Sequence, residues 1–123
     1  MIKSGIDLIR TNRLAEVNPA IRERFINRVF TQQEQVQAKG DFETLSGIFS
    51  AKEAVSKALG TGIGKVAWQD IEILHERTGE PLVHLHGFAK EVAEFKGLKE
   101  WSVSITHDGG MAAAVAVAIG ETT

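Results

Sequence analysis

The first ten residues, MIKSGIDLIR, alternate between apolar and polar positions. Such alternation is typical of a β-strand, whose successive side chains point to opposite faces. The pattern predicts an N-terminal strand with Ile2, Ile6 and Leu8 on one face. Asp7 interrupts the apolar run, which makes it a candidate for a special role.

Start and stop signals then predict three successive helices. The pair Asn18–Pro19 opens the first, because Asn can cap free backbone N–H groups and Pro fits the first helical position. The sequence TQQE at residues 31–34 is a capping box that opens the second, which Gly40 ends. The third runs from about Phe42 to Leu59, with Gly60 as its stop. Its apolar residues lie near one side: Leu45, Ile48, Val55 and Leu59.

Strand patterns dominate the second half of the chain. Residues 70–74 and 82–86, DIEIL and LVHLH, flank the turn sequence ERTGE and predict a β-hairpin. Residues 87–97 predict a short amphipathic helix. Its inward residues are expected to be Phe88, Val92 and Phe95.

A second hairpin is predicted at the end, across the turn DGG. The strand WSVSITH alternates strictly, with Trp101, Val103 and Ile105 inward. The strand MAAAVAVAIG has small apolar residues throughout and is expected to be buried on both faces. The order of strand, three helices, hairpin, helix and hairpin indicates an α+β fold rather than a regularly alternating α/β fold.

Composition narrows the class of protein. The 123 residues suit one globular domain, residues 1–123, and a net charge of −2 does not favour nucleic acid or membrane partners. The absence of Cys excludes disulfides, thiolate metal sites and a cysteine nucleophile. No apolar run approaches the ~20 residues of a membrane span, and no signal-peptide pattern opens the sequence. We therefore expect a cytoplasmic protein.

Asp7, Glu53 and Lys57 are candidates for chemistry. A carboxylate in an apolar strand is costly to bury unless it meets Arg10, Arg13, a helix N-terminus or a metal. Glu53 and Lys57 are four residues apart, so they share one helix face, often only as a solvated ion pair. Alternatively, Asp7 and Glu53 could together hold Mg²⁺, which takes a few carboxylates plus water and phosphate oxygens. Lys57 would then lie near that phosphate.

A glycine-rich segment, GTGIGK, follows the third predicted helix. It is not a P-loop, because its glycines end a helix rather than open one. Glycine after a helix is usually only a cap, but three glycines in five residues indicate close approach of a ligand or of another backbone. Any phosphate affinity would come from backbone N–H groups and from Lys57 and Lys65.

Histidines and arginines suggest further contacts. His84 and His86 share a strand face near His75, which would suit zinc but lacks a clear further ligand. His107 ends the strand WSVSITH at a turn, where binding residues are often found. A basic excess near the start suits either an acidic partner or a solvated helix surface. It comprises Arg10, Arg13, Arg22, Arg24 and Arg28.

Three stretches together resemble one family. GIDLIRTNRL near the start, FSAKEAVSKALGTGIG in the middle and VSITH near the end are similar, in order and spacing, to holo-acyl-carrier-protein synthase. This is the small bacterial type of 4′-phosphopantetheinyl transferase, and the resemblance covers nearly the whole chain. It implies transfer of 4′-phosphopantetheine from coenzyme A to a serine of apo acyl carrier protein, for fatty acid biosynthesis. Adenosine 3′,5′-bisphosphate would be released.

The resemblance also implies roles for individual residues. Asp7 and Glu53 would bind Mg²⁺, with Mn²⁺ as an alternative, and would form the catalytic set with Lys57. Coenzyme A would contact Lys57, Gly60, Thr61, Gly62, Lys65 and His107. The carrier protein would contact Arg13, Arg22, Arg24 and Arg28. The base could be Glu53, a metal-bound water or His107. Members of this type are usually homotrimers that bind coenzyme A between subunits.

Two positions depart from the family pattern. Members commonly have an arginine where this chain has Ile48, so another basic residue would have to make that contact with the coenzyme phosphates. Ser50 replaces a usual alanine and is expected to matter little.

Two other functions fit parts of the pattern. A non-catalytic coenzyme A or nucleotide-binding module would not need Asp7 and Glu53 together, and a protein-interaction domain would leave Asp7 and the glycine segment unexplained.

Overall fold

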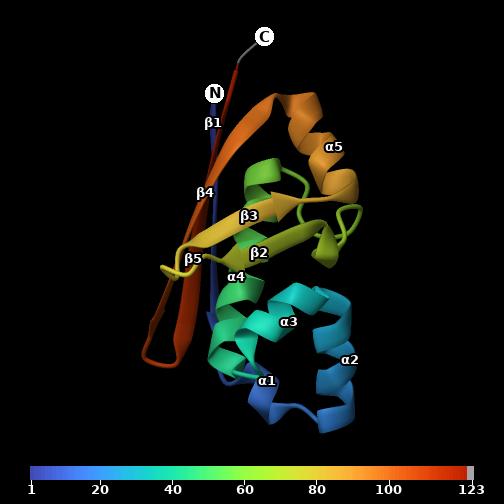
Figure 1. Cartoon of the computed structure of the whole chain (residues 1–123), viewed down its shortest axis with the longest axis vertical. Coiled ribbons are helices and arrows are strands. Elements are labelled where there is room, and N and C mark those ends of the chain that lie inside the picture. Colours follow the sequence, from blue (N-terminus) through green and yellow to red (C-terminus); the bar gives the residue numbers. More distant parts are fainter. Residues whose placement is uncertain (122–123) are drawn as a thin grey trace.

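The computed structural model describes residues 1–121, whose elements are shown in Figure 1. In chain order they are β1 (Ile2–Arg10), α1 (Arg13–Glu16), α2 (Pro19–Val29), α3 (Gln32–Ala38), α4 (Phe42–Leu59), the 3-10 turn η1 (Trp68–Asp70), β2 (Ile71–His75), β3 (Pro81–Leu85), α5 (Gly87–Lys96), β4 (Leu98–Asp108) and β5 (Met111–Gly120). This order confirms the predicted α+β class. The short helix α1 was not predicted, because four residues are too few to show a helical period.

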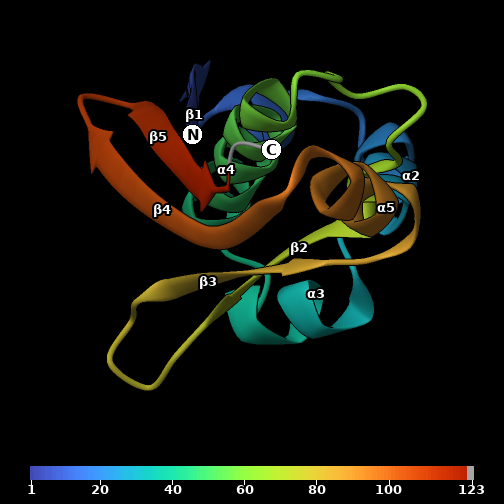
Figure 2. The same cartoon turned by 90° about the horizontal axis from the view of Figure 1, so that it is seen from above.

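The long helix α4 organises the molecule. It packs against a three-stranded antiparallel sheet in the order β1–β5–β4 and also contacts the separate β2–β3 hairpin (Figure 2). Its predicted apolar side is buried, because the sheet and the hairpin cover it. The middle strand β5 meets α4 with alternate small residues, so helix and sheet can approach closely. These buried residues are Ala112, Ala114, Ala116 and Ala118.

Gly5 brings β1 closer still to α4. A Cβ at this position would stand 2.0 Å from the carbonyl oxygen of Ala54 and 2.9 Å from the backbone nitrogen of Ala58. Both atoms belong to the helix backbone and cannot swing aside. The glycine therefore allows β1 to lie directly on α4. Asp7, two residues further on, points to the same face of the strand.

A buried ion pair holds α4 from another side. Lys52 Nζ lies 2.8 Å from Glu34 Oε1, and both side chains are 0% exposed. Lys52 also donates to the carbonyls of Trp68 at 3.0 Å and Ile71 at 2.6 Å, while Glu34 accepts from the backbone N–H of Ile73. Burial lowers the pKa of Lys52, and the negative charge of Glu34 offsets part of this by raising it. The pair links α3, α4 and the start of β2.

The predicted helix signals are confirmed. The Asn18 side chain accepts a hydrogen bond from the N–H of Ala20, and Thr31 and Glu34 form the capping box at the start of α3. Gly60 ends α4 with a φ of 81°, a left-handed conformation that glycine adopts without a steric cost. Local chemistry at these ends therefore sets the helix bounds.

The prediction for α5 is wrong in its orientation. Phe88 and Phe95 are 42% and 92% exposed, whereas Ala89 and Ala93 are buried. The helix packs on β4 and η1 through these small residues, which permit a closer approach than phenylalanine would allow. Val92 is half-buried.

The prediction that β5 is buried on both faces is also wrong. Its outer face carries Val115 and Ile119, which are 38% and 48% exposed. Across the ladder, Ile2 pairs with Ile119 and Ile6 with Val115, so the predicted apolar face of β1 continues this outer face. The sheet thus presents an apolar surface away from α4. Within residues 1–121, no helix combines the length and apolar character needed to cross a membrane.

Candidate active site

β1 and α4 bring Asp7, Ser50, Glu53 and Lys57 together at one edge. Ser50 Oγ lies 3.1 Å from Asp7 Oδ2, and Lys57 Nζ lies 3.5 Å from Asp7 Oδ1. Lys57 also donates to the carbonyl of Ile6 at 2.8 Å. The partners of Asp7 are thus on α4, and the sequence-based alternative of Arg10 or Arg13 is wrong. Asp7 is 17% exposed and Lys57 is 50% exposed, so this edge is open to a ligand.

Glu53 and Asp7 act on each other electrostatically. Burial raises the pKa of Glu53 above its usual value, and the negative charge of Asp7 raises it further. The positive charge of Lys57 works in the opposite direction. Two carboxylates and one ammonium group therefore lie close together. The carboxylates suit a cation and the ammonium group suits a phosphate, so the region favours a cation and a phosphate bound together.

The glycine segment after α4 is hydrogen-bonded to the last turn of the helix. The N–H groups of Thr61 and Gly62 both donate to the carbonyl of Ser56, and that of Gly60 donates to the carbonyl of Lys57. These N–H groups cap the helix, so a phosphate here would depend mainly on side chains. Thr61 and Lys65 are exposed nearby and can supply them.

His107 belongs to a different pocket, on the β4 side of α4. Its Nε2 lies 2.9 Å from the carbonyl oxygen of Glu43, and it faces Gly47, where a Cβ would stand 2.9 Å from that nitrogen. The pocket has a volume of about 290 Å³ and is also lined by His75 and Gly79. Since β1 and β4 are separated by β5, His107 lies two strands, or roughly 10 Å, to the side of β1. One chain alone does not bring it to Asp7.

The remaining histidines do not form a metal site. His86 Nε2 lies 3.0 Å from Glu72 Oε1, and His84 is exposed. In the described part of the chain, no three or more His, Cys, Asp or Glu residues are grouped so that they could hold a metal. The zinc hypothesis therefore has no support from this structure.

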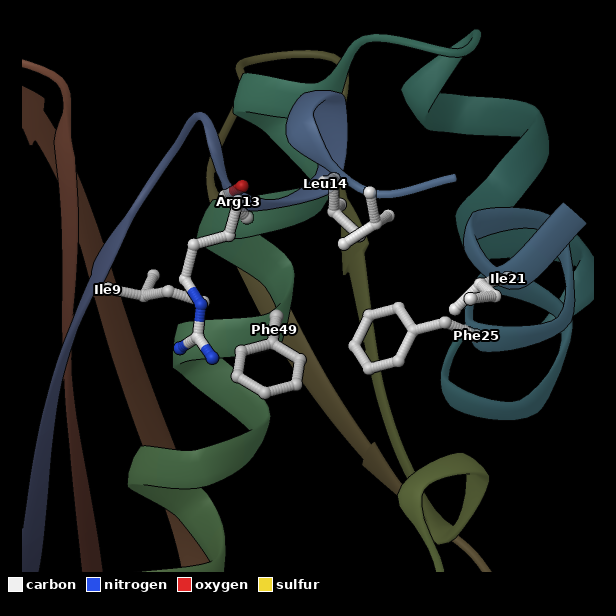
Figure 3. Close-up of a pocket in the computed structure, with 8 residues that line it drawn as sticks. Ile9, Arg13, Leu14, Ile21, Phe25 and Phe49 are labelled. Carbon is white, nitrogen blue, oxygen red and sulfur yellow. The ribbon is translucent and has the colours of Figure 1, made fainter. Parts of the chain in front are cut away.

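Arg13 lies beside an apolar pocket of about 260 Å³ (Figure 3). Its side chain extends between Ile9 and Phe49, and Phe49 belongs to α4 one turn before Glu53. The other lining residues are Leu14, Val17, Ile21, Phe25 and Ser46. Arg22 is half-buried over the ring of Phe42, whereas Arg24 and Arg28 are exposed along α2.

The arrangement of these elements matches a known family. The model of the 4′-phosphopantetheinyl transferase superfamily matches residues 3–117. The chain belongs to this superfamily. It is 44% identical over 119 residues to a holo-[acyl-carrier-protein] synthase of Caldanaerobacter subterraneus, covering 94% of this chain and 93% of that protein. The holo-[acyl-carrier-protein] synthase of Alkaliphilus metalliredigens is 43% identical over 125 residues, covering 96% of this chain and 99% of that protein.

Solved structures of the superfamily have the same fold. The holo-[acyl-carrier-protein] synthase of Helicobacter pylori in complex with coenzyme A has a TM-score of 0.84 and 35% identity, covering 97% of this chain and 100% of that one. The Bacillus anthracis synthase, in complex with CoA (3′,5′-ADP), has a TM-score of 0.77 and 33% identity, with coverage of 97% and 96%.

Two features of this phosphopantetheinyl transferase were missed from the sequence. Ser50, expected to matter little, contacts Asp7 as alanine could not. Its spacing from Glu53, one helical turn, was the only available signal. Lys52 and Glu34 pair over a long sequence separation, which no local pattern reveals. Ile48, which the sequence places on the apolar side of the helix, is fully buried in the core.

Proposed function

We propose that this protein transfers 4′-phosphopantetheine from coenzyme A to a serine of apo acyl carrier protein, giving holo-acyl carrier protein and adenosine 3′,5′-bisphosphate. The observation that carries the proposal is the convergence of Asp7, Glu53 and Lys57 at one open edge of β1 and α4. The names of the relatives and their coenzyme A complexes support it. We further propose that the carrier serves fatty acid biosynthesis in the cytoplasm.

Asp7 and Glu53 would hold Mg²⁺, with Mn²⁺ as an alternative. Carboxylate oxygens are the hard ligands that Mg²⁺ prefers, and a cation would relieve the repulsion that raises the pKa of Glu53. With only two carboxylates here, the other positions would go to water and to substrate phosphates, as is usual for this ion. When bound, the ion neutralises the pyrophosphate and makes its phosphorus more electrophilic.

The residues of this chain would handle the proton and the leaving group. The serine oxygen of the carrier would attack the phosphorus that bears pantetheine, and the bond from that phosphorus to the bridging oxygen would break. The serine proton would pass to a carboxylate oxygen of Glu53 acting as general base. Lys57 uses one N–H on the Ile6 carbonyl, so further N–H donors remain for the leaving phosphate.

Coenzyme A would bind between subunits of a homotrimer. Lys57, Thr61 and Lys65 would contact its phosphates, with Gly60 and Gly62 giving room for them. The separation of His107 from Asp7 supports this arrangement, because a neighbouring copy could supply His107 to the site. The apolar outer face of the sheet supports association of copies, since large exposed apolar surfaces mark interfaces.

The carrier protein would dock at Arg13 and the exposed face of α2. The apolar pocket beside Arg13 offers a place for an apolar side chain, and its wall at Phe49 is one turn from Glu53. Arg22, Arg24 and Arg28 would add positive charge for an acidic carrier surface. A carrier held there would present its serine near Asp7 and Glu53.

Mass spectrometry of apo acyl carrier protein tests the proposal. After incubation with this protein, coenzyme A and Mg²⁺, the carrier should gain the mass of phosphopantetheine. EDTA, Asp7→Asn and Glu53→Gln should each abolish the gain, whereas Glu76→Gln, an exposed acid in the turn between β2 and β3, should not. Tight coenzyme A binding without transfer to several apo carriers would instead support the non-catalytic binding module.

A further inference from the structure

Ser50 directs its hydroxyl at Asp7. The side chain is 0% exposed, and Oγ lies 3.1 Å from Asp7 Oδ2 and 3.1 Å from the Asp7 carbonyl oxygen. A hydroxyl group carries a single proton, so either bond ties Ser50 to the same residue. A serine inside a helix often bonds a carbonyl of its own helix, as Ser56 does with Glu53 at 2.7 Å. Ser50 instead reaches across to β1.

This contact limits how the Asp7 carboxylate can rotate. The terminal torsion of Asp has no sharp preference, so its oxygens keep one orientation only where neighbours hold them. Ser50 holds Oδ2 from a buried position, whereas Lys57 stands 3.5 Å from Oδ1 and is half exposed. Ser50 is therefore the firmer of the two restraints.

We propose that Ser50 is a positioning residue that fixes the Asp7 carboxylate in the orientation in which it binds a divalent cation together with Glu53. The inference rests on the proposed function, because it concerns the same cation. Partners that hydrogen-bond to a metal ligand typically change metal affinity by ~10–100-fold. Ser50 would thus set the affinity for the cation without touching it.

Binding of Mn²⁺ tests this role without reference to activity. Electron paramagnetic resonance of free Mn²⁺, measured with protein and coenzyme A, gives the dissociation constant directly. Ser50→Ala should weaken Mn²⁺ binding by roughly tenfold or more. Ser50→Cys, with a weaker donor of similar size, should fall between wild type and Ser50→Ala. In the transfer assay, high Mg²⁺ concentrations should restore most of the rate of Ser50→Ala.

Ser46→Ala is the matched control. Ser46 lies one turn earlier on the same helix, is 1% exposed and contacts the carbonyl oxygen of Thr11 at 3.4 Å rather than Asp7. Removing its hydroxyl should affect thermal unfolding about as much as Ser50→Ala does, but should leave Mn²⁺ affinity unchanged. Thermal unfolding measured without metal therefore reports any loss of stability in each variant, whereas Mn²⁺ affinity reports whether the Asp7 carboxylate has lost its orientation.

The outcomes distinguish this inference from the proposed function. A loss of Mn²⁺ affinity in Ser50→Ala but not in Ser46→Ala would support the positioning role. Equal affinities of folded wild type and Ser50→Ala would overturn it while leaving carrier modification intact. A wild-type protein that neither binds Mn²⁺ nor modifies a carrier would overturn the proposed function, and the positioning role with it.

Discussion

Gly5→Ala is expected to push β1 away from α4. The new Cβ would lie 2.0 Å from the carbonyl oxygen of Ala54 and 2.9 Å from Cβ of Lys57, far inside ordinary contact distance. Relief requires the strand and helix to separate by roughly 1–1.5 Å, since comfortable contacts begin near 3.5 Å. The obstructing carbonyl belongs to the helix backbone, so no side-chain rotation can absorb the clash.

The expected cost has two parts. Overpacking in a core usually costs ~1–3 kcal/mol, and a backbone obstruction places Gly5→Ala at or above the upper end. In addition, Asp7 moves with the strand relative to Glu53, and a displacement of ~1 Å in a catalytic group can cost ~100-fold in rate. The transfer rate of Gly5→Ala should therefore fall by a much larger factor than the fraction of the variant that is folded.

Urea unfolding and the carrier mass assay measure these two effects separately. Ser4→Ala is the control, because Ser4 lies on the same strand but is exposed on its other face. It should change the free energy of unfolding by less than ~0.5 kcal/mol. If Gly5→Ala matched Ser4→Ala in both unfolding and rate, the close approach of β1 to α4 would not be what places Asp7.

Three further predictions concern other regions. Lys52→Met should lower the free energy of unfolding by ~3–5 kcal/mol in urea titrations, because Glu34 would be left buried without its counter-ion. Burial raises the pKa of Glu72, but its hydrogen bonds with Thr31 and His86 outweigh this and hold the pKa below its ordinary value. As pH falls, the unfolded state therefore binds the proton of Glu72 before the folded state does, and the free energy of unfolding decreases below about pH 4.5. In urea titrations over this pH range, Glu72→Gln should lose less of its free energy of unfolding than the wild type. Arg13→Glu should raise the KM for the carrier roughly tenfold or more in transfer kinetics, with coenzyme A affinity by calorimetry unchanged.

Local signals in the sequence were enough for the bounds of α2, α3 and α4 and for the shared helix face of Glu53 and Lys57. Caps at Asn18, Thr31 and Gly60 mark ends because they act on backbone groups within a few residues. Glu53 and Lys57 share a face by helical spacing alone. The same reasoning failed for α5, where an aromatic pattern suggested burial of Phe95 but tertiary packing favoured small residues.

Contacts between distant segments could not be read from the sequence. Lys52 and Glu34 look like surface residues in composition, yet together they form a buried pair because α3, α4 and β2 meet there. Ser50 looked like a neutral replacement for alanine, and only the position of β1 gives its hydroxyl a partner. Such pairings depend on the final distance between elements, which local propensity does not determine.

The distance between β1 and α4 links the stability of this protein to its chemistry. Gly5 removes the side chain that would separate them, Ser50 bonds to Asp7, and Lys57 bonds to the carbonyl of Ile6. On β1 these contacts involve the three residues from Gly5 to Asp7, and on α4 they lie between Ser50 and Ala58. His107, by contrast, contacts the first part of α4, where its ring nitrogen lies 2.9 Å from the carbonyl oxygen of Glu43. Changes on the β1 side should therefore alter stability and rate together, whereas changes at His107 should act on coenzyme binding with little effect on the core.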